Sequence, residues 1–215
     1  MNKTAILVGA TGLVGSHVLK LLLEDDRYST VKVFHRRSTG IEHEKLEEYI
    51  IDFDHIEDWS EKLAGNELYS AMGTTIKKAG SKEAQYKIDV TYPLEVAKAA
   101  AENGVKKYSL VSSAGANKDS KLFYPRIKGE LDSAVSRLSF NRITIMRPSI
   151  LDGERNESRP GERFGLASMR LMGKIPGLTK YRPIPAEQVA TAMINSLQED
   201  DTGCYIFGPE EVFHL

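Results

Sequence analysis

Residues 4–15 read Thr-Ala-Ile-Leu-Val-Gly-Ala-Thr-Gly-Leu-Val-Gly, an apolar run followed by three glycines spaced three apart. A short, unbroken apolar run is typical of a strand buried on both faces of a parallel sheet. Apolar residues then recur at helical spacing, at Leu13, Val14, Val18, Leu21 and Leu22. The stretch therefore predicts a strand, a tight turn and a helix, the beginning of a βαβ unit.

The three glycines fit a turn that holds a dinucleotide. Gly9 allows a sharp exit from the strand, Gly12 lets the backbone approach a pyrophosphate, and Gly15 lets the helix pack close to the sheet. The free N–H groups of the helix N-terminus attract the negative charge. We therefore predict a dinucleotide site whose contacts are Gly9, Thr11, Gly12, Leu13 and Val14. The alternative is a glycine turn that serves packing alone.

The end of the second predicted strand, Val31 to Phe34, bears on the choice of dinucleotide. An acidic residue there would bind the ribose hydroxyls of NAD, but the chain continues His35-Arg36-Arg37. Guanidinium groups bind a 2′-phosphate through charge-assisted hydrogen bonds. The pattern favours NADP(H) over NAD(H), with Arg36 and Arg37 as phosphate ligands. The alternative is that both are solvated loop charges.

The rest of the chain alternates strands and helices. Further strands are predicted at Tyr49–Phe53, Leu68–Met72, Lys107–Val111, Arg142–Met146 and Cys204–Phe207, and helices at Val90–Glu102, Pro125–Leu138 and Pro185–Leu197. This rhythm predicts an α/β protein with a Rossmann-type, doubly wound, mainly parallel sheet. We expect one NAD(P)-binding domain over residues 1–215, in which 149–215 form a reduced substrate-side lobe. Residues 152–182 lack a clean period and are expected to wall the substrate pocket.

Two other strand ends offer cofactor contacts. Asp52 and Phe53 end the third predicted strand, where Asp52 would accept from an adenine amino group; a solvated strand-end acid is the alternative. Gly73, Thr74 and Thr75 follow the fourth strand, and small residues there suit close passage of a cofactor. A plain turn is the competing interpretation.

The fifth strand leads to the candidate catalytic residues. Ser112 and Ser113 end it, and Tyr124 and Lys128 follow four apart, on one face of a helix that Pro125 would open as its first residue. A nearby ammonium and a helix N-terminus favour the phenolate, so Tyr124 can exchange a proton with a carbonyl or alcohol oxygen. A serine hydroxyl would polarise that oxygen, and Lys128 can also hold the nicotinamide ribose. The alternative is a half-buried aromatic residue beside a solvated lysine.

Composition limits the remaining classes of function. Apolar residues make up 41% of the chain and charged residues 27%, with a formal net charge of -1, so no basic face for nucleic acid or an anionic membrane is expected. The single cysteine, Cys204, excludes an intrachain disulfide and a multi-cysteine metal site, and it is expected to be a small buried residue. No apolar stretch fits a signal peptide or a membrane span, which predicts a cytoplasmic protein.

The quoted motifs together resemble the short-chain dehydrogenase/reductase family, in an atypical, extended-like form that includes oxidoreductase-like and nucleoside-diphosphate-sugar epimerase-like bacterial proteins. Further matching stretches are Lys78-Ala79-Gly80, Arg147-Pro148 and Glu157-Ser158-Arg159-Pro160-Gly161-Glu162. The resemblance implies a Rossmann core with NADP(H) at the strand carboxyl ends. It implies Ser113, Tyr124 and Lys128 as the catalytic set, with Ser112 as the alternative serine. It also implies a nicotinamide-side loop that includes Pro148 and Ile150.

The favoured function is therefore NADP(H)-dependent hydride transfer to or from a small carbonyl or alcohol. A cofactor-bound sensor or protein-interaction module with little turnover is the alternative. A sugar-nucleotide epimerase or dehydratase is disfavoured, since those enzymes carry a larger C-terminal domain, and Asp89 stands near the place of the family's helix asparagine. The expected partner is a small-molecule substrate, and a homo-oligomer is left open.

Overall fold

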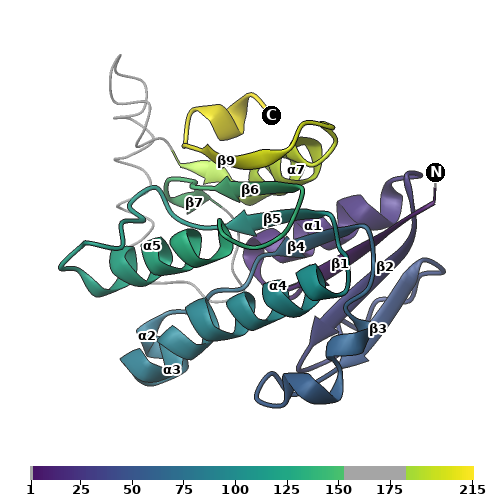
Figure 1. Ribbon diagram of the computed structural model, residues 1–215, viewed down its shortest axis with the longest axis horizontal. Coiled ribbons are helices and arrows are strands. Elements are labelled where there is room, and N and C mark those ends of the chain that lie inside the picture. Colours follow the sequence, from purple (N-terminus) through teal and green to yellow (C-terminus); the bar gives the residue numbers. More distant parts are fainter. Residues whose placement is uncertain (1, 153–182) are drawn as a thin grey trace.

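The structure is a computed structural model that describes residues 2–152 and 183–215. Its main sheet has the strand order β3-β2-β1-β4-β5-β6-β9, and every neighbouring pair is parallel (Figure 1). The strands are β1 (Lys3–Val8), β2 (Tyr28–His35), β3 (Leu46–Ile50), β4 (Glu67–Ser70), β5 (Lys107–Val111), β6 (Arg142–Met146) and β9 (Gly203–Phe207). The strand order reverses between β1 and β4, which is where this fold binds ligands. The predicted Rossmann-type sheet is confirmed.

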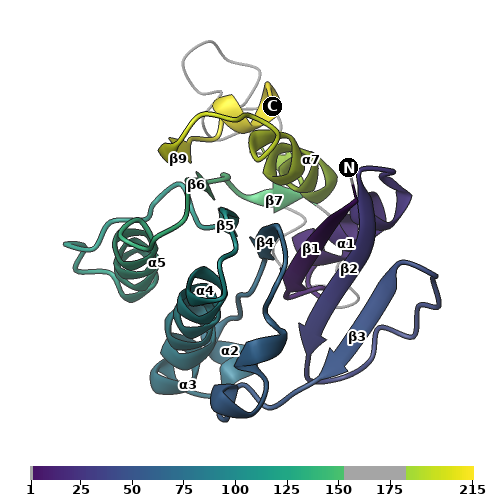
Figure 2. The same cartoon turned by 45° about the vertical axis from the view of Figure 1, so that its right-hand side comes forward.

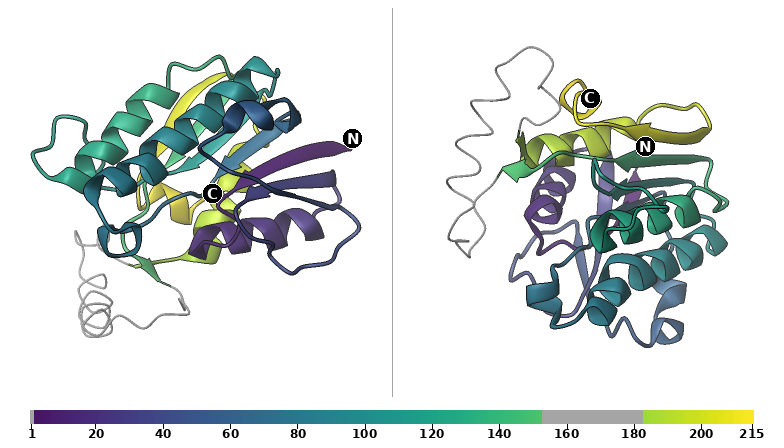
Figure 3. Two further views of the ribbon diagram at one scale, coloured as in Figure 1. Left: turned by 90° about the horizontal axis from the view of Figure 1, so that it is seen from below. Right: turned by 90° about the vertical axis from the view of Figure 1, so that its left-hand side faces the viewer.

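Helices cover both faces of the sheet (Figures 2 and 3). They are α1 (Leu13–Glu24), α2 (Ile76–Ala79), α3 (Lys82–Tyr86), α4 (Tyr92–Glu102), α5 (Phe123–Val135) and α7 (Ala186–Ser196). Helices α1 and α7 pack on one face, and α4 and α5 on the other. Two short strands, β7 (Leu151–Asp152) and β8 (Ile184–Pro185), pair beside the sheet. No helix in the described ranges is long and apolar enough to cross a membrane.

The central strand β1 explains the unbroken apolar run. Ala5 and Leu7 belong to the core under α1 and α7, and Ile6 and Val8 to the core under α4 and α5. All four side chains are fully buried. Since both faces of the strand are covered, no position of the run faces water.

Two expectations about edge strands are wrong. The third strand is Leu46–Ile50 rather than Tyr49–Phe53, because β3 lies at the sheet edge, where half-exposed charged residues are tolerated. Cys204 is exposed rather than buried, because β9 forms the opposite edge. Alternation of exposed positions weakens the apolar signal in both strands.

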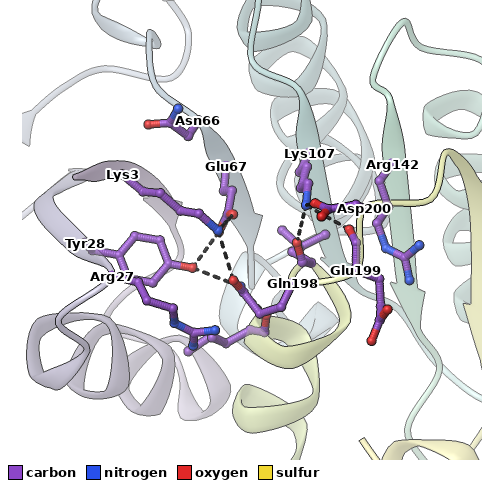
Figure 4. A network of polar contacts seen from close by, with 12 residues as sticks. Lys3, Arg27, Tyr28, Asn66, Glu67, Lys107, Arg142, Gln198, Glu199 and Asp200 are labelled. Atoms are coloured by element: carbon purple, nitrogen blue, oxygen red, sulfur yellow. Dashed lines mark hydrogen bonds and ion pairs between the residues drawn. The ribbon is translucent and has the colours of Figure 1, made fainter. Parts of the chain in front are cut away.

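A closed polar network lies at the amino edge of the sheet, where the parallel strands begin (Figure 4). The buried Glu67 carboxylate accepts hydrogen bonds from Lys3 Nζ at 2.7 Å, Tyr28 Oη at 2.5 Å and Tyr69 Oη at 2.7 Å. The side-chain amide of Gln198 accepts from Lys3 Nζ at 2.9 Å and donates to Tyr28 Oη at 3.3 Å. Burial, with Glu67 next to them, raises the pKa of both tyrosines. The network joins β1, β2 and β4 to the end of α7.

Two further cations tie the C-terminal segment to this edge. Lys107 Nζ donates to the carbonyls of Leu197 and Glu199, each at 2.8 Å (Figure 4). Arg142 Nε donates to the carbonyl of Ser196 at 2.6 Å. These bonds satisfy carbonyls at the C-terminal end of α7, which no later turn of helix can reach. These hydrogen bonds at the amino edge therefore hold the C-terminal segment against the sheet.

Candidate cofactor and catalytic site

The glycine turn leaves no room for side chains. A Cβ on Gly9, whose φ is +86°, would lie 2.6 Å from the carbonyl of Ala71 after β4. A Cβ on Gly15 would lie 2.0 Å from the Gly9 carbonyl oxygen, and one on Gly12 would lie 3.1 Å from the same atom. The three glycines therefore allow β1, the turn and α1 to come together as closely as a dinucleotide-binding turn requires.

The N-terminus of α1 is open to an anion. Its N-cap is Gly12, in extended conformation, and among residues 2–152 and 183–215 no side-chain hydrogen bond caps the helix. Thr11 is exposed, while Val14 is buried and Leu13 half-buried, so the latter two can offer backbone N–H groups rather than side chains. A helix of twelve residues without a side-chain cap suits a pyrophosphate. The predicted cradle fits the cofactor.

Arg36 and Arg37 lie at the same edge of the sheet as the glycine turn. Val8 pairs with Phe34 in the parallel register, so both strands end side by side and the two exposed arginines follow directly. The loop beyond them is fixed by Glu48 of β3, which the sequence did not single out. Its carboxylate accepts from Ser38 Oγ at 2.6 Å and from the Thr39 backbone N–H at 2.8 Å, and it also accepts from Thr39 Oγ1.

Asp52 and Phe53 occupy different environments. Asp52 is exposed, and its backbone carbonyl accepts from Trp59 Nε1 at 2.8 Å. Phe53 is buried, with its ring stacked on Tyr92 and edge-on to Trp59. Only Asp52 is presented at the surface, so the adenine contact stays a prediction.

The segment after β4 is held by a buried carboxylate. The Thr74 backbone N–H donates to Asp89 Oδ1 at 2.6 Å, and Gln85 Nε2 donates to Asp89 Oδ2 at 3.0 Å. Asp89 lies on a single π-helical turn, Lys87–Thr91, that precedes α4. Gly73 is exposed, and Thr75 caps the short helix α2 by accepting from the Lys78 backbone N–H. Single π-helical turns often mark functional sites.

The four catalytic candidates lie at the carboxyl edge of the sheet, where the parallel strands end. Helix α5 begins at Phe123, so Tyr124 lies in its first turn and Lys128 one turn later. Tyr124 is 43% exposed, whereas Lys128 is 3% exposed and donates to the Val111 carbonyl at 3.2 Å. The expectation that Pro125 is the first helical residue is wrong, because the helix begins two residues earlier, at Phe123, with Leu122 at the N-cap position. Proline is still tolerated there, since first-turn N–H groups have no partner within the helix.

The two serines face different surroundings. Ser113 is half-buried, while Ser112 is 5% exposed, and its Oγ has no hydrogen-bond partner among the described residues. The Ala114 backbone N–H donates to the Pro148 carbonyl at 3.0 Å, which joins this loop to the segment after β6. Pro148 is buried and Ile150 is 44% exposed. Residues 153–182, which were expected to complete the pocket and include the 157–162 motif, lie outside the described residues.

Lys128 is surrounded by charges that the sequence pattern did not bring together. Asp132, one turn further along α5, accepts from Arg147 Nε at 2.9 Å. Burial lowers the pKa of Lys128, and the neighbouring Asp89 and Asp132 oppose that shift. Burial raises the pKa of both carboxyls, although Lys128 lowers it. The spacing of Lys128 and Asp132 was the available signal, because residues four apart share a helix face.

The chain matches known proteins along most of its length. Residues 9–200 match the family described as NAD(P)H-binding. The mitochondrial protein fmp52 of Aspergillus niger is 37% identical over 217 residues, which cover 96% of this chain and 92% of that protein. Protein HTATIP2 of Rattus norvegicus is 31% identical over 207 residues, covering 94% and 84%.

Solved structures share the fold at low identity. A UDP-N-acetylglucosamine 4-epimerase from Methanobrevibacter ruminantium superposes with a TM-score of 0.71 at 18% identity, covering 99% of this chain and 80% of that one. A short chain dehydrogenase family protein from Francisella tularensis gives a TM-score of 0.67 at 15% identity, with 96% of each chain covered.

The comparisons also correct one expectation and settle the family. The prediction of a cytoplasmic protein is wrong, since several fungal relatives are named mitochondrial. A single cysteine and the lack of a secretory signal pattern do not distinguish one reducing compartment from another. The predicted family is confirmed: the chain belongs to the NAD(P)H-binding, short-chain dehydrogenase/reductase-like family of Rossmann proteins.

Proposed function

We propose that this protein is an NADP(H)-dependent oxidoreductase that interconverts a small carbonyl compound and its alcohol. The observation that carries this proposal is the pairing of Tyr124 and Lys128 on the first two turns of α5. The phenol is exposed, while the ammonium one turn later is buried. This pairing lies at the carboxyl edge, beside the glycine turn that fits a dinucleotide.

Tyr124 acts as the acid–base group. A phenol has a pKa near 10 and exchanges protons poorly at neutral pH unless a cation favours its ionised form. Lys128 supplies this cation, and its buried position strengthens the effect because less water screens the charge. A bound nicotinamide supplies or accepts the hydride, and Tyr124 gives or takes the proton at the substrate oxygen.

Ser113 is the serine that we assign to the substrate oxygen. It is half-buried at the open end of β5, whereas Ser112 is buried beside Asp132. A hydroxyl at the open end of the strand can donate to an oxygen on which negative charge develops. Ser112 is better placed to support the groups behind the site.

Arg36 and Arg37 support the choice of NADP(H). They are exposed at the edge where the ribose of a dinucleotide in the glycine turn would lie, and the strand end carries no acidic residue. The structural likeness to sugar-nucleotide epimerases concerns the fold, so it does not favour a sugar-nucleotide substrate here.

The test compares the wild-type protein with Tyr124→Phe. We expect NADPH to raise the melting temperature of both proteins, since the substitution leaves the cofactor cradle intact. We expect NADPH consumption with a panel of small aldehydes and ketones to fall about 100-fold or more in Tyr124→Phe, the usual worth of a general acid. Equal turnover by both proteins would refute the role of Tyr124. Binding of NADPH without turnover by the wild type would favour the sensor function.

A further inference from the structure

Lys128 is a buried cation with two buried carboxylates, Asp89 and Asp132, as its electrostatic neighbours. Lys128 and Asp132 are each 3% exposed and lie one turn apart on α5, and Asp89 is 1% exposed on the π-helical turn that packs against this helix. Water reaches none of the three groups freely. Their charges therefore act on one another with little screening.

The two carboxylates differ in what else they bind. Both oxygens of Asp89 are occupied, by the Thr74 backbone N–H and by Gln85. Asp132 uses one oxygen on Arg147, while its buried Oδ1 makes no hydrogen bond of normal geometry in the described parts of the chain, although the Ser112 hydroxyl lies beside this carboxylate. Asp132 thus keeps more of its negative charge available to its neighbours.

Arg147 neutralises Asp132 only in part. Its side chain is 26% exposed, and it lines a hollow of about 290 Å³ on the flank of α5, together with Asn117 and Gly129. Solvent in this hollow screens the guanidinium. Asp132 also lines the hollow, but its side chain is only 4% exposed. The negative charge of Asp132 therefore also stabilises the protonated form of Lys128.

We propose that Asp132 is a positioning residue that, together with Asp89, keeps the buried Lys128 protonated and so sets the pH range in which Tyr124 exchanges protons. This inference rests on the proposed function, because it assigns Tyr124 as the acid–base group. Among the described residues, the charged groups that act on Lys128 are Asp132 on its own helix and Asp89 on the π-helical turn. Tyr124 lies one turn before Lys128 on α5. Arg147 acts on it through Asp132.

The sign of the pH effect follows from burial. Burial lowers the pKa of Lys128 in the folded protein below the value of an unfolded lysine, and the two carboxylates limit this shift. The folded state therefore loses this proton first, and stability rises with pH between the two pKa values. Removing Asp132 lowers the folded pKa further, so the rise begins at lower pH.

The experiment measures urea unfolding from pH 7 to 10 in four proteins: wild type, Asp132→Asn, Lys128→Met and the double variant. For Asp132→Asn we expect the unfolding equilibrium constant to fall with pH over a wider range than in the wild type, by up to about tenfold per pH unit for one proton. The double variant should follow Lys128→Met, because the lysine that titrates is gone. Tyrosines and Cys204 titrate in all four proteins, so they cancel in the comparison.

Two further variants guard against a purely structural effect. Asp132→Glu keeps the charge and should keep the wild-type pH dependence, and the exposed Asp119→Asn should match the wild type throughout. If Asp132→Asn is destabilised equally at every pH, Asp132 only supports packing and the proposal is overturned. If that variant does not fold, Asp89→Asn takes its place with the same expected direction.

A kinetic arm separates this inference from the proposed function. For the alcohol that corresponds to a carbonyl substrate from the panel, the rate of oxidation should rise with pH as Tyr124 loses its proton. In Asp132→Asn this rise should move to higher pH, because Tyr124 loses part of its neighbouring positive charge. An unmoved rise would overturn the proposal. If no substrate is found, the proposed function fails while the unfolding experiment still decides whether Asp132 controls Lys128.

Discussion

The buried charged groups at the two edges of the sheet differ in how many hydrogen-bond partners they have. At the amino edge, the Glu67 carboxylate accepts three hydrogen bonds from two tyrosines and Lys3. At the carboxyl edge, within the part of the chain that the structure describes, Asp132 Oδ1 makes no hydrogen bond and Lys128 donates to the Val111 carbonyl alone. A satisfied network fixes structure, whereas buried charges without full partners shift their protonation equilibria, which suits a site that moves protons.

The largest expected effect is on stability and comes from the amino edge. Glu67→Ala would leave the cation and two phenols of this network without their shared acceptor, and we expect a loss of about 3 kcal/mol. For a chain of this length, this loss corresponds to a fall in melting temperature of roughly 10 °C. The measurement is thermal unfolding, with the exposed Glu102→Ala as the matched control.

The same variant tests whether the two edges are independent. The dissociation constant of NADPH, measured below the new melting temperature, should be unchanged in Glu67→Ala. A weaker constant would mean that the amino-edge network also shapes the cofactor site, and the contrast between the edges would no longer hold.

The second effect concerns the cofactor cradle at the carboxyl edge. In Gly15→Ala the new Cβ would meet the Gly9 carbonyl oxygen at 2.0 Å, which forces the turn and α1 apart. We expect NADP(H) binding to weaken by about 100-fold, equivalent to about 2.7 kcal/mol. Isothermal titration gives the constant directly.

Gly115→Ala is the control for this prediction. It lies at the same edge, its φ is not positive, and its nearest neighbour would be Pro125 Cγ at 4.0 Å. Wild-type affinity in Gly15→Ala would show that this glycine serves helix packing alone, the alternative left open by the sequence.

The sequence predicts one kind of feature at these edges better than the other. The glycine turn, Arg36 and Arg37 could be predicted as cofactor contacts because each is a local pattern beside a strand that is buried on both faces. Strands β5 and β6 were predicted at their observed limits, since central strands are buried on both faces and keep a strong apolar pattern. The edge strand β3 was misplaced because its half-exposed residues carry a weaker apolar pattern.

Features that depend on tertiary packing were not predictable in the same way. Asp132 shares a helix face with Lys128, but Asp89 and Arg147 come from separate segments. Only tertiary packing, with the π-helical turn against α5, brings Asp89 to Lys128 and Arg147 to Asp132. The Glu67 network likewise joins residues up to 195 positions apart. A charged residue in a strand or helix is more often solvated, so its sequence context does not reveal a buried partner.

The third effect concerns the choice between the two dinucleotides. The double variant Arg36→Gln, Arg37→Gln removes two exposed cations. We expect it to bind NADP⁺ at least about tenfold more weakly, because charge-assisted hydrogen bonds to the 2′-phosphate are lost. NAD⁺ lacks the 2′-phosphate, so its affinity should stay within twofold or so of wild type. Arg137→Gln, an equally exposed arginine after α5, is the control. A parallel loss of both cofactors would show that the arginines do not read the phosphate.

The smallest expected effect is on NADP⁺ affinity and comes from Glu48. This residue accepts several hydrogen bonds at the carboxyl edge, so it tests whether a satisfied network can also serve binding. Glu48 holds the loop after Arg37 through Ser38 and Thr39. Burial raises the pKa of this carboxyl, but the hydrogen bonds from that loop and nearby His35 outweigh it and keep the group ionised. The hydrogen bonds from Ser38 and Thr39 to Glu48 therefore persist at neutral pH and support the loop that follows the two arginines.

Glu48→Gln should loosen this loop without removing a phosphate ligand. We expect NADP⁺ affinity to fall about threefold to fivefold, the cost of losing one hydrogen bond of ordinary strength, while NAD⁺ affinity stays the same. The neighbouring Glu47→Gln is the control, because Glu47 is exposed and accepts a hydrogen bond from Tyr49 Oη at 2.8 Å rather than from the loop after Arg37. An equal fall for both cofactors would mean that Glu48 stabilises β3 and not the arginines. A fall for NADP⁺ alone would show that a satisfied network can serve selectivity, so that full pairing at an edge does not by itself mark it as structural.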